Sequence, residues 1–65
     1  MNYETTLSRE KHLKELIKQE STGTPIQLAA KLNTSISTVF RLIRALKQMG
    51  EPIVYSKIRQ TYYYK

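Results

Sequence analysis

Two arginines and two short hydroxyl side chains stand close together in the second half of the chain: Ser37, Thr38, Arg41 and Arg44. A guanidinium group can donate two parallel hydrogen bonds to the edge of guanine, and a small hydroxyl group can approach any base edge. At about 100° per residue of an α-helix, Ser37, Arg41 and Arg44 fall on one side. These residues can therefore read base edges only if they form a helix whose arginine side stays exposed.

Side chains suited to other chemistry are nearly absent. The chain has no cysteine, no aspartate and a single histidine, His12. No second metal ligand accompanies His12, so we interpret it as a solvated or half-buried side chain. No set of nucleophile, base and acid, no glycine-rich phosphate loop and no cluster of metal ligands is recognisable. The sequence predicts a protein that is not an enzyme and that takes no cofactor and no metal.

Positive charge is concentrated in the last two-thirds of this 65-residue chain, whose net charge is +6. Residues 1–20 have equal numbers of basic and acidic side chains, whereas residues 21–65 have seven basic side chains against Glu51 alone. A one-sided positive field attracts polyanions. The sequence has no apolar run of the roughly 20 residues that cross a bilayer and no secretory signal. We expect a cytoplasmic protein with no membrane partner.

Hydrophobic periodicity predicts one domain, residues 1–65, made of three helices and a small β-hairpin. Thr24 and Gln27 have the spacing of a capping box at the start of the second helix, and Ser35 is the expected cap of the third. Thr6 or Ser8 is the expected cap of the first helix. The expected elements are helices at about residues 7–20, 25–32 and 36–49 and a hairpin at about residues 53–64.

The third helix has the most pronounced division into an apolar and a polar side. Its apolar side is expected to be buried and consists of Val39, Leu42, Ile43, Leu46 and Met49. Phe40 lies on the flank of the polar side. Two roles remain open for Ile36 and Phe40: contact with a thymine methyl group, or packing under the hairpin.

The last segment changes to β-branched and aromatic residues, which favour strands. Six residues without glycine, asparagine or proline separate the two expected strands, so the turn between them is weakly encoded. Tyr55, Tyr62 and Tyr64 are expected to supply the packing face of this hairpin. Stacking of these rings on single-stranded bases is the alternative.

Two stretches carry a family resemblance. Residues 28–43, LAAKLNTSISTVFRLI, resemble the pattern LAexLgvSxxTvxRdI of bacterial winged helix-turn-helix regulators, and residues 50–55, GEPIVY, with the tyrosines at 62–64, resemble the wing pattern GxPIxY…gYxY. The order and spacing are similar to the biotin-repressor amino-terminal type, also found ahead of sensor domains, over roughly residues 9–64. The resemblance implies a mostly α, three-helix winged helix-turn-helix that binds double-stranded DNA selectively, in a transcriptional regulator or a mobile-element protein.

The same resemblance implies where DNA would be contacted. The third helix would enter the major groove, with its cap near a phosphate and its polar side on base edges. The preceding helix and the wing would hold the phosphate backbone or an adjacent groove. The candidate DNA-binding residues are Thr24, Lys31, Ser35, Ser37, Thr38, Arg41, Arg44, Lys57 and Arg59.

Other partners remain open. A monomer of this size covers little DNA, so tight binding would need a homodimer or a repeated site. The main alternative function is a protein–protein interaction or dimerisation module that uses the tyrosine-rich wing and Phe40. Binding of RNA or of single strands is a third alternative, which requires exposed tyrosines.

Overall fold

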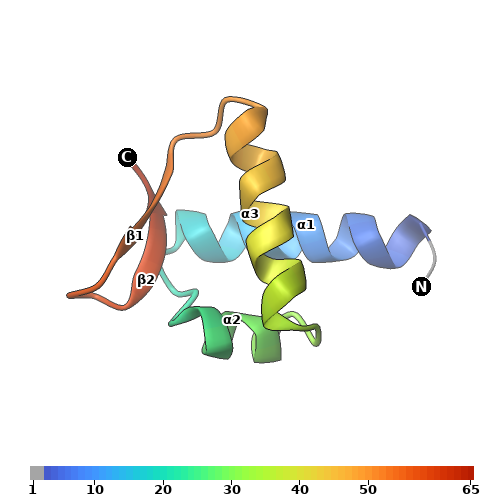
Figure 1. Cartoon of the computed structure of the whole chain (residues 1–65), viewed down its shortest axis with the longest axis horizontal. Helices are drawn as coiled ribbons and strands as arrows, with labels where there is room; N and C mark the ends of the chain where they lie inside the picture. Colours follow the sequence, from blue (N-terminus) through green and yellow to red (C-terminus); the bar gives the residue numbers. More distant parts are fainter. Residues whose placement is uncertain (1–2) are drawn as a thin grey trace.

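A computed structural model describes the backbone of residues 3–65 and the side chains of residues 8–65. Three helices precede a hairpin in the chain, and α3 crosses α1 in the view of Figure 1. The two strands are antiparallel, and a four-residue loop joins them because Ser56 lies opposite Thr61. The predicted fold class is confirmed. The elements are α1 (Tyr3–Lys18), α2 (Pro25–Lys31), α3 (Ile36–Gln48), β1 (Ile53–Ser56) and β2 (Thr61–Tyr64).

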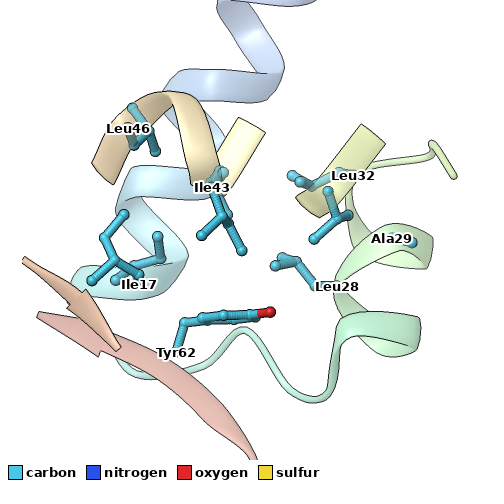
Figure 2. Close-up of a cluster of buried hydrophobic side chains, with 10 residues drawn as sticks. Ile17, Leu28, Ala29, Leu32, Ile43, Leu46 and Tyr62 are labelled. Carbon is cyan, nitrogen blue, oxygen red and sulfur yellow. The ribbon is translucent and has the colours of Figure 1, made fainter. Parts of the chain in front are cut away.

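All five elements contribute side chains to a single hydrophobic cluster. Figure 2 shows the ring of Tyr62 extending from β2 toward Leu28 of α2, close to Ile43 of α3. Burial of this apolar surface is the main stabilising contribution in so small a domain. The cluster consists of Leu13, Ile17, Leu28, Ala29, Leu32, Val39, Ile43, Leu46, Ile53 and Tyr62.

Each helix is followed, two residues after its last residue, by a residue with left-handed backbone. Glu20, Asn33 and Gly50 have φ values of 54°, 54° and 96°, and the N–H groups that follow each helix return to its last carbonyls. Asparagine and glycine tolerate this conformation and were expected to end the second and third helices. Glu20 was not expected to do so, because a glutamate seldom has a positive φ.

Two predictions about the helices, the cap of the first and the burial of Met49, are wrong. Helix α1 already begins at Tyr3, so Thr6 and Ser8 lie inside it and neither caps its start. No glycine or proline occurs before Gly23, so nothing local stops the helix from extending back to Tyr3. Met49 is 70% exposed rather than buried. It is the C-terminal cap residue of α3, and the buried residues of that helix end one turn earlier, at Leu46.

Two hydroxyl groups attach the hairpin to the loop between α1 and α2. Thr22 and Thr61 are both buried, and their Oγ1 atoms lie 3.0 Å apart. The backbone N–H of Tyr62 donates to Thr22 Oγ1 over 2.8 Å, and the backbone N–H of Thr22 donates to Thr61 Oγ1 over 3.1 Å. The hydroxyl pair therefore satisfies two buried backbone donors that belong to different segments.

A second polar contact holds the open end of the hairpin. The Tyr64 hydroxyl donates to Glu51 Oε1 over 2.7 Å, and Lys14 Nζ on α1 lies 3.2 Å from Glu51 Oε2. The hydrogen bond from Tyr64 and the charge of Lys14 lower the pKa of Glu51, although partial burial opposes them. Burial and the hydrogen bond to Glu51 raise the pKa of Tyr64 to about 12.

The shifted pKa of Tyr64 predicts an alkaline loss of stability. The unfolded chain releases this proton near the ordinary pKa of 10.0, whereas the folded chain holds it up to about 12. The protonated hydroxyl of Tyr64 therefore adds to the free energy of unfolding below pH 10. This stabilisation is lost as the pH rises from 10 to about 12. Thermal unfolding on both sides of the interval measures the effect. Tyr64→Phe has no such proton, so it should lose less stability over the same interval; an equal loss would contradict the assignment.

Candidate nucleic-acid interface

One face of α3 carries four side chains that form a continuous surface, here called the α3 stripe: Ser37, Phe40, Arg41 and Arg44. Their spacing of i, i+3, i+4 and i+7 places them on one side over two helical turns. Together they line a shallow hollow of about 330 Å³. The buried residues of α3 lie on the opposite side and fix the helix to the core, so the stripe is held outward.

Both guanidinium groups of the α3 stripe are exposed. Among the residues that the structure describes, neither Arg41 nor Arg44 has a hydrogen-bond or ion-pair partner. The arginine side of the helix is therefore directed to solvent and not to the interior of the protein. Both charges are available to an acceptor outside the chain.

The start of α3 is closed by two hydroxyl groups. Ser35 is the N-terminal cap, as predicted; its Oγ accepts a hydrogen bond from the backbone N–H of Thr38 over 3.2 Å and lies 3.0 Å from Thr38 Oγ1. Thr38 is half-buried and lies outside the α3 stripe. The backbone N–H groups of Ile36 and Ser37 have no acceptor within the helix because they belong to its first turn.

An arginine of α1 fixes the turn between α2 and α3. Arg9 Nε donates to the carbonyl of Leu32 over 3.2 Å, and its terminal nitrogen donates to the carbonyl of Asn33 over 3.1 Å. These carbonyls follow the last residue of α2, where no helical N–H remains to bind them. The turn that leads into α3 is therefore held to α1 by charge-assisted hydrogen bonds.

The hairpin loop carries two cationic side chains, one exposed without a partner among the described residues and one in an ion pair. Ser56 Oγ accepts from the backbone N–H of Arg59 over 3.1 Å, which closes the loop. Lys57 is exposed and has no partner within the described part of the chain. Arg59 forms an ion pair with Glu20 at the end of α1, and its guanidinium carbon lies 4.9 Å from the centre of the Tyr63 ring.

Comparison with protein-family models gives a match. A family model described as an HTH domain matches residues 8–64, which includes α2, the turn, α3 and the hairpin. The chain belongs to the helix-turn-helix domain family. Proteins of this family bind DNA. No curated protein and no solved structure matches the chain significantly. Similarity to the biotin-repressor type in particular stays a prediction.

Within this helix-turn-helix domain, the two candidate residues of α2 already have internal partners. Thr24 Oγ1 accepts from the backbone N–H of Gln27 over 3.3 Å, while Gln27 Oε1 accepts from the N–H of Thr24 over 2.9 Å. Gly23 beside this capping box has a φ of 75°, which other residues rarely adopt, and a Cβ there would displace Gln27 Oε1, which would lie only 2.5 Å away. Lys31 Nζ donates to the carbonyl of Ser21. The helix-turn-helix thus uses these side chains to hold α2 in place.

The tyrosines of the wing mostly face the core of the helix-turn-helix domain. Tyr62 is buried, and Tyr55 and Tyr64 are half-buried and pack against the core. The rings of Tyr55 and Tyr62 are 4.8 Å apart. The expected packing face is confirmed, and these three rings are not free to stack on single-stranded bases.

Three residues that position the helix-turn-helix were not predicted from the sequence: Arg9, Glu20 and Thr22. Each bonds to a partner far away in the chain, at Leu32, Arg59 and Thr61 respectively, and no local pattern indicates such pairs.

Among the described residues, no helix is long and apolar enough to span a membrane, and no group of three potential ligands is placed to hold a metal ion.

Proposed function

We propose that this domain binds double-stranded DNA selectively, as part of a transcriptional regulator or a mobile-element protein. Helix α3 enters the major groove, with Ser37, Thr38 and Arg41 at base edges. Arg44 lies one turn further along and binds a phosphate. The N–H groups at the start of α3, next to the Ser35 cap, face another phosphate.

The remaining candidates hold the DNA backbone in this proposal. Thr24 and Lys31 border α2 and reach phosphates beside the major groove, while Lys57 and Arg59 reach phosphates or the groove next to the wing. Phosphate contacts of this kind fix the position of the domain, whereas base contacts choose the sequence.

The observation that carries the proposal is the pair of exposed guanidinium groups on α3, neither of which has a partner in the described part of the chain. Two like charges one turn apart on a helix repel each other and slightly oppose folding. A duplex supplies acceptors for both. The interaction-module alternative has less support, because three of the tyrosines that it would use are packed against the core.

Selection of bound sequences from a random duplex pool at two salt concentrations tests the proposal. We expect a consensus containing a guanine opposite Arg41. If roughly five phosphates are neutralised, log affinity should fall against log salt concentration with a slope of about −4 to −5. Recovery of random sequences, or an affinity independent of salt, would end the proposal.

The ion pair between Arg59 and Glu20 predicts that one acidic residue weakens DNA binding. A phosphate near the wing must displace the Glu20 carboxylate before it can bind Arg59. Both side chains are about half exposed, where such pairs contribute about 0.2–1 kcal/mol. Glu20→Gln should therefore strengthen duplex binding by about 1.4- to 5-fold and leave the salt slope nearly unchanged, because Arg59 neutralises the same phosphate in both proteins. A salt titration of fluorescence anisotropy measures both quantities.

A charge-matched control for this experiment is Glu15→Gln. Glu15 is exposed on α1 and has no ion pair with any described residue. The substitution therefore removes one negative charge without freeing a cation from an ion pair. If both variants gain the same affinity, only net charge matters and the contact of Arg59 with phosphate is wrong.

A further inference from the structure

Phe40 is an exposed aromatic residue in the middle of a charged surface. Its side chain is 51% exposed, and it forms one wall of the hollow whose other walls are Ser37, Arg41 and Arg44. The hydrophobic cluster and the side chains packed against it do not include Phe40. The alternative of packing under the hairpin is therefore not what the structure adopts, and the ring contributes little to the core.

The surroundings of the ring restrict what can cover it. An apolar protein surface placed on the hollow would also desolvate two guanidinium groups, which is costly unless acceptors are supplied. DNA in the major groove supplies guanine and phosphate oxygens for both arginines. The apolar group that DNA presents at the same depth as these acceptors is the C5-methyl group of thymine.

We propose that Phe40 reads thymine. The ring contacts the C5-methyl group of one thymine in the major groove, beside the acceptors that Arg41 and Arg44 bind. The inference rests on the proposed insertion of α3 into the major groove and adds to it a specific base and a specific chemical group. Ser37, one turn before Phe40, leaves room for the methyl group because its side chain is small.

The test removes only the methyl group from the DNA. In a duplex that carries the selected sequence, each thymine is replaced in turn by deoxyuridine, and affinity for the unmodified protein is measured. We expect one replacement to weaken binding about fourfold, which corresponds to about 0.8 kcal/mol for one buried methyl group. Phe40→Ala should bind the thymine and uracil duplexes equally, and Phe40→Leu should retain part of the difference.

Met49→Ala is the matched control, because Met49 is an exposed apolar residue that caps the end of α3 and lies outside the α3 stripe. This variant should keep the full preference for the thymine duplex. If no thymine shows the effect while sequence selection persists, thymine reading is wrong and the proposed function stands. If Phe40→Ala keeps the effect, another residue contacts the methyl group and the assignment of Phe40 is overturned. Absence of any sequence selection would instead overturn the proposed function itself.

Discussion

Replacement of both Arg41 and Arg44 by alanine should abolish selective duplex binding without unfolding the domain. A bidentate contact with guanine contributes about 1–3 kcal/mol of discrimination, and loss of the second cation removes one phosphate contact as well. We therefore expect the affinity for the selected duplex to fall by about 100-fold or more. Both side chains are exposed and have no partner among residues 8–65, whose side chains the structure describes, so the circular dichroism of the helices should not change.

The control for this double variant removes the same charge elsewhere. Lys11 and Lys18 are exposed on α1 and form no ion pair with a described residue, so Lys11→Ala with Lys18→Ala lowers net charge equally. This control should reduce DNA affinity only slightly, because it lowers the general attraction between the positively charged protein and DNA. Comparable losses in the two double variants would show that α3 is not the helix that reads the site.

Thr22→Val should strongly destabilise the domain, although valine has nearly the same shape as threonine. The side chain of Thr22 is completely buried, and its Oγ1 accepts the N–H of Tyr62 over 2.8 Å. Valine fills the same space but leaves this N–H without an acceptor, which costs about 1–3 kcal/mol. For a domain of this size, each kcal/mol lowers the melting temperature by about 4–8 °C, which thermal denaturation measures directly.

Thr34→Val is the matched control for this substitution. Thr34 is half-buried, and its hydroxyl has no hydrogen bond within the described part of the chain, so the same exchange should change the melting temperature little. Thr61→Val should resemble Thr22→Val, because it deprives the N–H of Thr22 of its acceptor. If Thr22→Val and Thr34→Val had equal effects, the hydroxyl pair would not be what holds the wing.

The sequence alone determined the order of elements and the division of α3 into two sides. Local signals were sufficient for this: the capping box of Thr24 and Gln27, the Ser35 cap, and Asn33 and Gly50 after their helices. Apolar residues at helical spacing also identified Val39, Ile43 and Leu46 as buried. These features depend on residues within a few positions of one another, which is the range over which sequence patterns act.

Only the tertiary structure decided which polar side chains are left free for a partner. Arg59 and Arg41 are alike in the sequence, yet Arg59 pairs with Glu20, 39 residues away, whereas Arg41 has no partner among the described residues. Thr22 and Thr61, whose hydroxyl groups are in contact, are also 39 residues apart in the sequence. Phe40 stays outside the core and Tyr62 enters it because the path of the chain, and not the residue type, determines which surfaces meet. Such long-range contacts arise only when packed helices bring distant segments together, so no local pattern encodes them.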